Sequence, residues 1–191
     1  MTMAEIVLFH HAQGLTDGMN AFADELRSAG HTVHLPDLFE SQTFEDVESG
    51  VAYAQQIGFD TVLQRGVDAV ASLPDDLVYA GFSLGVMPAQ KLAQTRAGAR
   101  GALLIDACFP SDEFGSWPAG LPAQIHGGTD DDWFAEDIDA ARQLAEAQPS
   151  VNLFCYAGTA HLFADSSLPT YDAASAAQLR ERVADFLTRL A

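Results

Sequence analysis

A serine between two glycines is the most informative chemical feature of the sequence. Gly81-Phe82-Ser83-Leu84-Gly85 fits the pattern G-x-S-x-G, which places a serine in a sharp turn between a strand and a helix. Glycines on both sides let neighbouring backbone approach the turn without a Cβ clash. An incidental serine in a plain tight turn would give the same letters, so the pattern needs support from elsewhere in the chain. We take Ser83 as the predicted nucleophile.

A nucleophilic serine needs a base, and the base needs an acid that orients it. In enzymes with this turn, the serine, acid and histidine occur in that order along the chain, each after a strand. Gly127-Gly128-Thr129-Asp130 follows one strand-like run, and Ala157-Gly158-Thr159-Ala160-His161 follows a later one. This order predicts Asp130 as the acid and His161 as the base.

The acid has two alternatives, because Asp131 and Asp132 adjoin Asp130 and a shift of one residue would change the assignment. Another interpretation of the three acids is that they favour the N-terminus of the following helix through its dipole. His161 likewise has a structural alternative, but the strand and the glycine-containing segment before it favour a catalytic role.

The elements that position these residues are predicted by short apolar runs that alternate with helical patterns. Strands are expected at 6–9, 32–35, 77–80, 102–105, 123–126 and 151–156. Helices are expected at 18–29, 85–95, 135–147 and 173–190, and two more between 43 and 74, with capping residues Thr43, Asp46, Asp60 and Asp172. The pattern predicts one α/β domain over residues 1–191, with a mainly parallel sheet of about six strands.

These segments together resemble the dienelactone hydrolase family of α/β-hydrolases over essentially the whole chain. The matching segments are Leu8–Gly14, Pro36–Phe39, the turn around Ser83, His126–Asp130 and Ala157–Asp165 with the helix after it. The resemblance implies a three-layer α/β-hydrolase fold, and the chain has no insertion long enough for a cap domain. It also implies a triad of Ser83, Asp130 and His161, and an oxyanion hole formed by the backbone N–H groups of Leu84 and Ala12.

Three residues depart from the family's namesake enzyme. Ser83 replaces its nucleophilic cysteine, which favours ester chemistry through an alkoxide. His11 stands where that enzyme has a glutamate, and Asp165 stands where it has an arginine that binds the lactone's carboxylate. A carboxylate at that position would repel an anionic substrate. We therefore expect a small neutral ester or lactone as substrate rather than the namesake's dienelactone.

The substrate pocket is expected at the carboxyl edge of the sheet, where two predicted loops carry large aromatic residues. His11 is predicted to face this pocket, together with Phe109, Trp117 and Trp133. The alternative for each aromatic residue is that it anchors its own loop. His10 and His11 are adjacent at a strand end and point to opposite sides, so no metal site is predicted.

Composition excludes several classes of partner. The 191-residue chain carries 27 acidic and 9 basic residues, a net charge of −18. Such a charge repels nucleic acids and anionic membranes, and no apolar run reaches the ~20 residues of a membrane span. The five residues before the first strand leave no room for a secretory signal, which predicts a cytoplasmic location. Cys108 and Cys155, in apolar surroundings, are predicted to be buried free thiols.

The sequence therefore predicts a serine hydrolase that cleaves small neutral esters or lactones through an acyl-enzyme and uses no cofactor. A monomer or a homodimer fits the sequence equally. A thioesterase or amidase on the same fold is one alternative, and a non-catalytic small-molecule-binding protein is another. A separation of Ser83 and His161 beyond hydrogen-bond reach would favour the last alternative.

Overall fold

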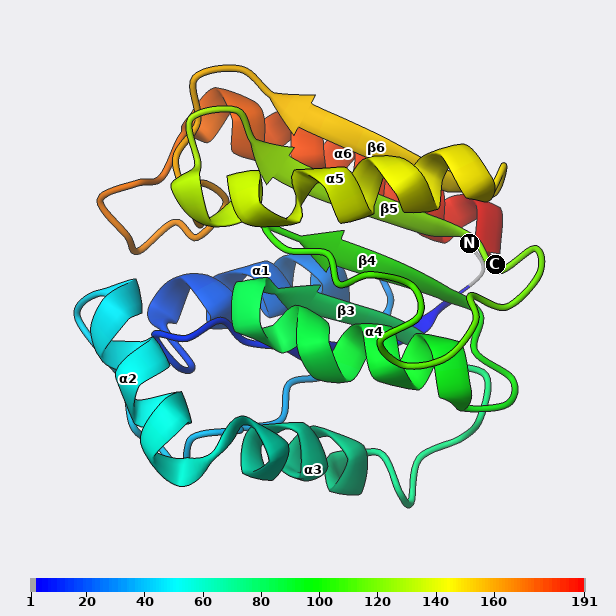
Figure 1. The fold of residues 1–191 in the computed structure, drawn as a ribbon, viewed down its shortest axis with the longest axis horizontal. Coiled ribbons are helices and arrows are strands. Elements are labelled where there is room, and N and C mark those ends of the chain that lie inside the picture. The colour runs from blue at the N-terminus through cyan, green and yellow to red at the C-terminus, as the bar shows by residue number, and fades with distance from the viewer. Residues whose placement is uncertain (1–2, 191) are drawn as a thin grey trace.

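A computed structural model describes residues 3–190, and six parallel strands form its central sheet (Figure 1). The strands are β1 (Glu5–Phe9), β2 (Thr32–His34), β3 (Val78–Phe82), β4 (Gly101–Ile105), β5 (Ala123–Gly128) and β6 (Val151–Tyr156). Their order across the sheet is β2-β1-β3-β4-β5-β6, and each neighbouring pair is parallel. The prediction of a mainly parallel six-stranded sheet is confirmed.

Helices lie on both faces of the sheet and make the three-layer architecture (Figure 1). They are α1 (Asp17–Ser28), α2 (Val47–Ile57), α3 (Phe59–Ala69), α4 (Val86–Thr95), α5 (Asp132–Ala147) and α6 (Ala173–Leu190), with a 3-10 turn, η1 (Ser83–Gly85), before α4. One face is covered by α4 and α5, with α3 packed beside α4, and the other by α1 and α6. Within the described residues no segment forms a cap domain.

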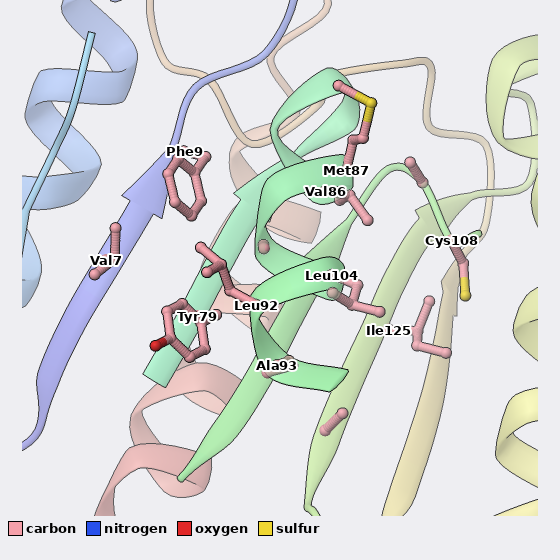
Figure 2. Packing of buried hydrophobic residues seen from close by; sticks show 14 of the residues in the cluster. Val7, Phe9, Tyr79, Val86, Met87, Leu92, Ala93, Leu104, Cys108 and Ile125 are labelled. Carbon is pink, nitrogen blue, oxygen red and sulfur yellow. The ribbon is translucent and has the colours of Figure 1, made fainter. Parts of the chain in front are cut away.

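Alternate residues of the strands pack into two separate apolar cores, because a strand turns successive side chains to opposite faces. Val7, Phe9 and Tyr79 belong to the core that also holds Val86 and Leu92 of α4, and Figure 2 shows Tyr79 next to Leu92. Their chain neighbours pack on the other side against α1 and α6. This two-sided burial holds the carboxyl ends of all six strands at one edge of a rigid sheet.

The helix starts agree with the sequence at some ends and differ at others. Asp46 caps α2 itself, accepting a hydrogen bond from the Ser49 amide at 2.7 Å, and Asp172 accepts from the Ser175 amide at 2.7 Å. Gly58, not the predicted Asp60, precedes α3. The start of α5 at Asp132 is three residues earlier than predicted, and this difference bears directly on the site described below.

The two cysteines differ in exposure. Both thiols are free, as predicted, and Cys108 is buried, but Cys155 is exposed. The expectation that Cys155 is buried is wrong because β6 is an edge strand and one of its sides is open. Among the helices of residues 3–190, none combines the length and the apolar character needed to cross a membrane.

Candidate active site

Ser83 lies in the predicted sharp turn between β3 and α4. Its φ of 49° is in the left-handed region, which is strained for a residue with a side chain. A Cβ at Gly81 would lie 2.2 Å from the Gly85 carbonyl oxygen, and one at Gly85 would lie 2.4 Å from the carbonyl oxygen of Phe9. Only glycine fits at these two positions, so the pattern seen in the sequence is a steric requirement of this turn.

His161 reaches Ser83 from a loop that follows the edge strand of the sheet. It lies in the loop after β6, and its Nε2 is 2.8 Å from the Ser83 Oγ. This distance is within hydrogen-bond reach. A non-catalytic protein would have been favoured by a larger separation of Ser83 and His161, which the structure does not have. Ser83 and His161 are 78 positions apart in the chain, and they meet because β3 and β6 end at the same edge of the sheet.

The hydrogen-bond partner of His161 is Asp131, which corrects the predicted Asp130. The Asp131 Oδ2 lies 2.7 Å from the His161 Nδ1, and both side chains are buried. Asp130 is exposed, and its backbone N–H donates to the Thr159 carbonyl at 3.2 Å. That bond between the two loops directs the Asp130 side chain toward solvent and the next side chain toward His161.

Asp131 has a second role that explains its place. It is the N-cap of α5, and its Oδ1 accepts hydrogen bonds from the amides of Trp133 at 2.9 Å and Phe134 at 3.1 Å. One carboxylate therefore caps the helix with one oxygen and binds His161 with the other. The sequence carried this signal, because an acid directly before a helix start is a cap candidate. The signal was missed because the helix was predicted to start at 135, and Asp131 does not directly precede that position.

The surroundings of His161 favour its protonated form. Burial lowers the pKa of His161, but the hydrogen bond to Asp131 and the charges of Asp106, Asp131 and Asp137 outweigh burial, and the net pKa is raised. An imidazolium formed during proton transfer from Ser83 is thus stabilised. Asp106, which sequence reasoning did not select, is one of these charges.

His11 and Asp165 lie together in a buried network instead of facing substrate. The His11 Nδ1 accepts from the Gln13 amide at 3.1 Å, so its Nε2–H donates to the Asp165 Oδ2 at 2.8 Å. Asp165 also accepts from the hydroxyls of Thr16 and Ser167. Burial raises the pKa of Asp165, but these donors outweigh it and bring the pKa down to about 2.

The network corrects two expectations, namely that His11 faces the pocket and that Asp165 repels substrate directly. Both side chains are fully buried, and neither lines the cleft at His161. Burial lowers the pKa of His11, so the pair is a neutral imidazole donating to a carboxylate. What it does is join the loop after β1, which carries Ala12, to the loop that carries His161.

His10 packs into the protein on the opposite side of the strand end from its neighbour. Its Nδ1–H donates to the His11 carbonyl at 2.7 Å, and its Nε2 accepts from the Leu38 amide at 2.9 Å. Burial lowers its pKa to about 4. Within residues 3–190 no three His, Cys, Asp or Glu side chains gather in a way that could hold a metal ion.

A cleft of about 370 Å³ opens at His161. Trp133 lies on its wall, 39% exposed, with its ring centroid 6.0 Å from that of His161. The other lining residues include apolar Val47, Leu168 and Pro169 and the carboxylates Glu45, Asp46, Glu48, Asp130 and Asp132. The volume suits a small molecule, and the rim is strongly negative.

Of the predicted pocket aromatics, Trp133 alone lines this cleft. Trp117 is buried, and its Nε1–H donates to the Leu121 carbonyl at 3.1 Å, which anchors its own loop. Phe109 packs against Phe114 with ring centroids 5.6 Å apart, at the edge of the core under α4. The loop-anchor alternative therefore describes Trp117 and Phe109. Burial raises the pKa of the neighbouring Cys108 thiol to about 12, which makes it a poor nucleophile.

The two predicted oxyanion donors lie on neighbouring segments. Leu84 follows Ser83 in η1, and Ala12 lies in the loop after β1, the strand that pairs with β3. Ala12 is fully buried, and its carbonyl packs closely against Gly50 of α2, where a Cβ would lie 1.9 Å from the Ala12 oxygen. The Ala12 segment is therefore held in place by α2 as well as by the network of His11.

Comparison with solved structures identifies the fold. A candidate dienelactone hydrolase from Klebsiella pneumoniae is similar at a TM-score of 0.77, with 16% identity over 96% of this chain and 86% of that one. The dienelactone hydrolase-like promiscuous phosphotriesterase P91, from metagenomic libraries, gives 0.76, with 20% identity over 98% and 86%. Esterase 2 of Thermogutta terrifontis, phosphorylated by paraoxon, gives 0.60, with 18% identity over 98% and 83%.

These similarities establish an α/β-hydrolase fold. A search among curated proteins found no match. The sequence profile of the dienelactone hydrolase family, by contrast, matches residues 2–191. With the strand order, the serine turn and the whole-length match in agreement, this chain belongs to the dienelactone hydrolase family, whose members are hydrolases of ester bonds.

Proposed function

We propose that this protein is a serine hydrolase that cleaves small neutral carboxylic esters or lactones through an acyl-enzyme at Ser83. The observation that carries the proposal is the continuous chain of hydrogen bonds from the Ser83 Oγ through His161 to Asp131, with distances of 2.8 and 2.7 Å. This is the arrangement that activates a serine, since the base accepts its proton and the acid fixes the tautomer of the base.

In the first step the Ser83 Oγ attacks the ester carbonyl while its proton moves to the His161 Nε2. The Nδ1–H stays on the imidazole and donates to Asp131, whose carboxylate stabilises the positive ring without taking the proton. The raised pKa of His161 favours this transfer. The tetrahedral intermediate then collapses as the bond to the leaving oxygen breaks, and His161 returns the proton to the departing alcohol.

In the second step water attacks the acyl-enzyme, with His161 again accepting the proton, and the acid and free Ser83 are released. The amides of Leu84 and Ala12 are proposed to bind the oxyanion in both steps. Each such donor contributes ~3–4 kcal/mol to the lowering of the barrier. The clamp between Asp165 and His11 would keep the Ala12 segment at the distance that this role needs.

The lining of the cleft supports a small substrate without negative charge. Its volume of about 370 Å³ holds a compact acyl or leaving group, and Trp133 with Leu168 and Pro169 offers apolar contact. Six carboxylates line the same cleft, that of Asp131 among them, and would repel an anionic ester. A neutral ester should therefore be hydrolysed faster than an otherwise matched ester that bears a carboxylate, and added salt should narrow the difference.

Labelling the nucleophile tests the proposal directly. The structural neighbour phosphorylated by paraoxon suggests the reagent: attack on the phosphorus forms an Oγ–P bond and releases 4-nitrophenolate. We expect one diethylphosphoryl group per chain on Ser83, located by peptide mass spectrometry, with loss of activity toward 4-nitrophenyl acetate. Ser83→Ala should take up no label, and Ser111→Ala, in a loop away from the cleft, is the matched control. Equal labelling of wild type and Ser83→Ala would refute the assignment.

The type of bond that is cleaved needs a separate measurement. A matched oxygen ester, thioester and amide with the same small acyl group should be compared by kcat/KM. We expect the oxygen ester to have the highest kcat/KM, because the small cleft offers no separate site for a large thiol or amine leaving group. A higher kcat/KM for the thioester or the amide would replace the esterase with that alternative.

A further inference from the structure

Asp106 is a buried acid at the same sheet edge as the triad, and the mechanism above does not use it. It follows β4 directly, next in register to Ser83, because Phe82 of β3 pairs with Ile105 of β4. Both residues have a left-handed backbone, with φ of 49° for Ser83 and 61° for Asp106. The Asp106 amide donates to the His126 carbonyl at 2.7 Å, which holds this turn against β5.

The path of the His161 loop brings it over Asp106. The loop leaves β6 at one edge of the sheet, and His161 in this loop reaches Ser83 at the carboxyl end of β3. It therefore crosses the carboxyl ends of β5 and β4, where Asp131 and Asp106 respectively stand. The Asp106 carboxylate contributes to raising the pKa of His161, and the Leu162 backbone N–H faces the carboxylate.

Asp106 has no hydrogen-bond partner for either carboxylate oxygen within the described part of the chain, although its exposed fraction is only 1%. Burial raises the pKa of Asp106 to about 7, the charge of Asp131 adds to the rise, and His161 and the Leu162 amide oppose it. An unpaired buried carboxyl costs stability, so an acid retained beside a reacting group is a candidate for function.

We propose that Asp106 is a second acid for His161, whose carboxylate stabilises the imidazolium that forms when His161 takes the Ser83 proton. The inference rests on the proposed function of Ser83. The proton passes only from the Ser83 Oγ to the His161 Nε2, and none is transferred to Asp106. Asp106 acts through space and through another side chain, so it is a positioning residue rather than a catalytic one.

Other titratable groups also act on His161. They are Asp131 from the loop after β5, Asp137 from α5 and neutral His11 from the loop after β1. Tyr156 of β6 interacts with Asp106 instead. Of these titratable groups, only Asp131 hydrogen-bonds the ring. Asp106 differs from these groups because its side chain is a buried carboxyl whose oxygens accept no hydrogen bond in the described part of the chain.

A double-mutant cycle measures the proposed role. The kcat for 4-nitrophenyl acetate is determined for wild type, Asp106→Asn, Asp131→Asn and the double variant. With Asp131 neutralised, Asp106 is the remaining acid that contributes most to raising the His161 pKa, so Asp106→Asn should lower kcat by about tenfold more in that background than in wild type. The same factor in both backgrounds, or no loss in either, would overturn the proposal.

The titration of His161 gives a readout that a purely structural role would not move. In a Ser83→Ala background, NMR should show a lower His161 pKa with Asp106→Asn and no change with exposed Asp130→Asn as control. Asn tolerates a left-handed backbone, and Asp106→Gly offers a second carboxyl-free variant should Asn misfold. An unchanged His161 pKa in the folded variants would refute the inference.

The two experiments separate failure of this inference from failure of the proposed function. Turnover by wild type and phosphorylation of Ser83 without coupling between Asp106 and Asp131 would remove Asp106 and leave the hydrolase intact. Absence of turnover by wild type would overturn the proposed function, and the NMR titration would still decide whether Asp106 acts on His161.

Discussion

Lowering the pH from 7 to 5 should destabilise this protein through His126. This side chain is fully buried in β5, where Nε2–H donates to the Gln124 Oε1 at 3.1 Å and Nδ1 accepts from the Tyr156 hydroxyl at 2.8 Å. Both ring nitrogens are thus committed in the neutral form. Burial, and next the charge of Arg182, lower the pKa of His126 to about 3.

The size of the effect follows from proton linkage. The unfolded chain binds a proton at histidine below pH ~6.5, whereas the folded chain binds it at His126 only near pH 3. The stabilising contribution is therefore complete above pH 6.5 and is lost as the pH falls from 6.5 toward 3. Over the roughly 1.5 pH units between 6.5 and 5, at ~1.4 kcal/mol per unit, His126 alone lowers the free energy of unfolding by about 2 kcal/mol.

Urea unfolding at pH 7 and pH 5, followed by circular dichroism, measures this difference. His126→Gln removes the titrating ring, so the loss of free energy between the two pH values should shrink by about 2 kcal/mol relative to wild type. Tyr156→Phe is the matched control: it removes one hydrogen bond but keeps the buried ring, so it should lower stability and preserve the pH dependence. An unchanged pH dependence in His126→Gln would refute the reasoning.

Three further predictions concern the site and its frame. Asp130→Asn should change kcat for 4-nitrophenyl acetate by less than about twofold, whereas Asp131→Asn should lower it by at least about 100-fold, because Asp131 and not Asp130 hydrogen-bonds His161. Gly127→Ala would place a Cβ 2.1 Å from the Phe134 ring and should lower the free energy of unfolding by ~1–3 kcal/mol, measured by urea titration. An unchanged free energy of unfolding would mean that α5 shifts freely. Asp165→Asn would leave several buried donors with one acceptor oxygen and should lower the free energy of unfolding by ~2–3 kcal/mol in the same assay. An unchanged free energy of unfolding would contradict the stabilising role of the network of His11 and Asp165.

The main positions of the site could be predicted from the sequence because their signals are local. The turn around Ser83 has a steric requirement for glycine at two fixed positions, and His161 follows an apolar strand through a glycine-containing loop. The alternation of strands and helices likewise predicted the architecture, since a parallel sheet needs a crossover between each pair of strands. Each of these features depends on neighbours in the sequence.

The assignment of Asp131 over Asp130 could not be made in this way. Three consecutive acids present the same chemistry, and the choice depends on where α5 begins and on the hydrogen bond from the Asp130 amide to the Thr159 carbonyl. The error in the helix start and the error in the acid have one cause, because the cap of α5 is also the partner of His161. Asp106 went unnoticed since its role depends on the path of a loop from β6.

The sequence by itself determined that the chain is an α/β-hydrolase with a serine turn, because backbone sterics and apolar periodicity are properties of short segments. Tertiary structure decided which acid meets His161, which aromatic residue lines the cleft, and that His11 and Asp165 form a buried clamp. Those outcomes depend on side chains that lie far apart in the chain, from 30 residues for Asp131 and His161 to 154 for His11 and Asp165, and they are brought together only at the common edge of the sheet.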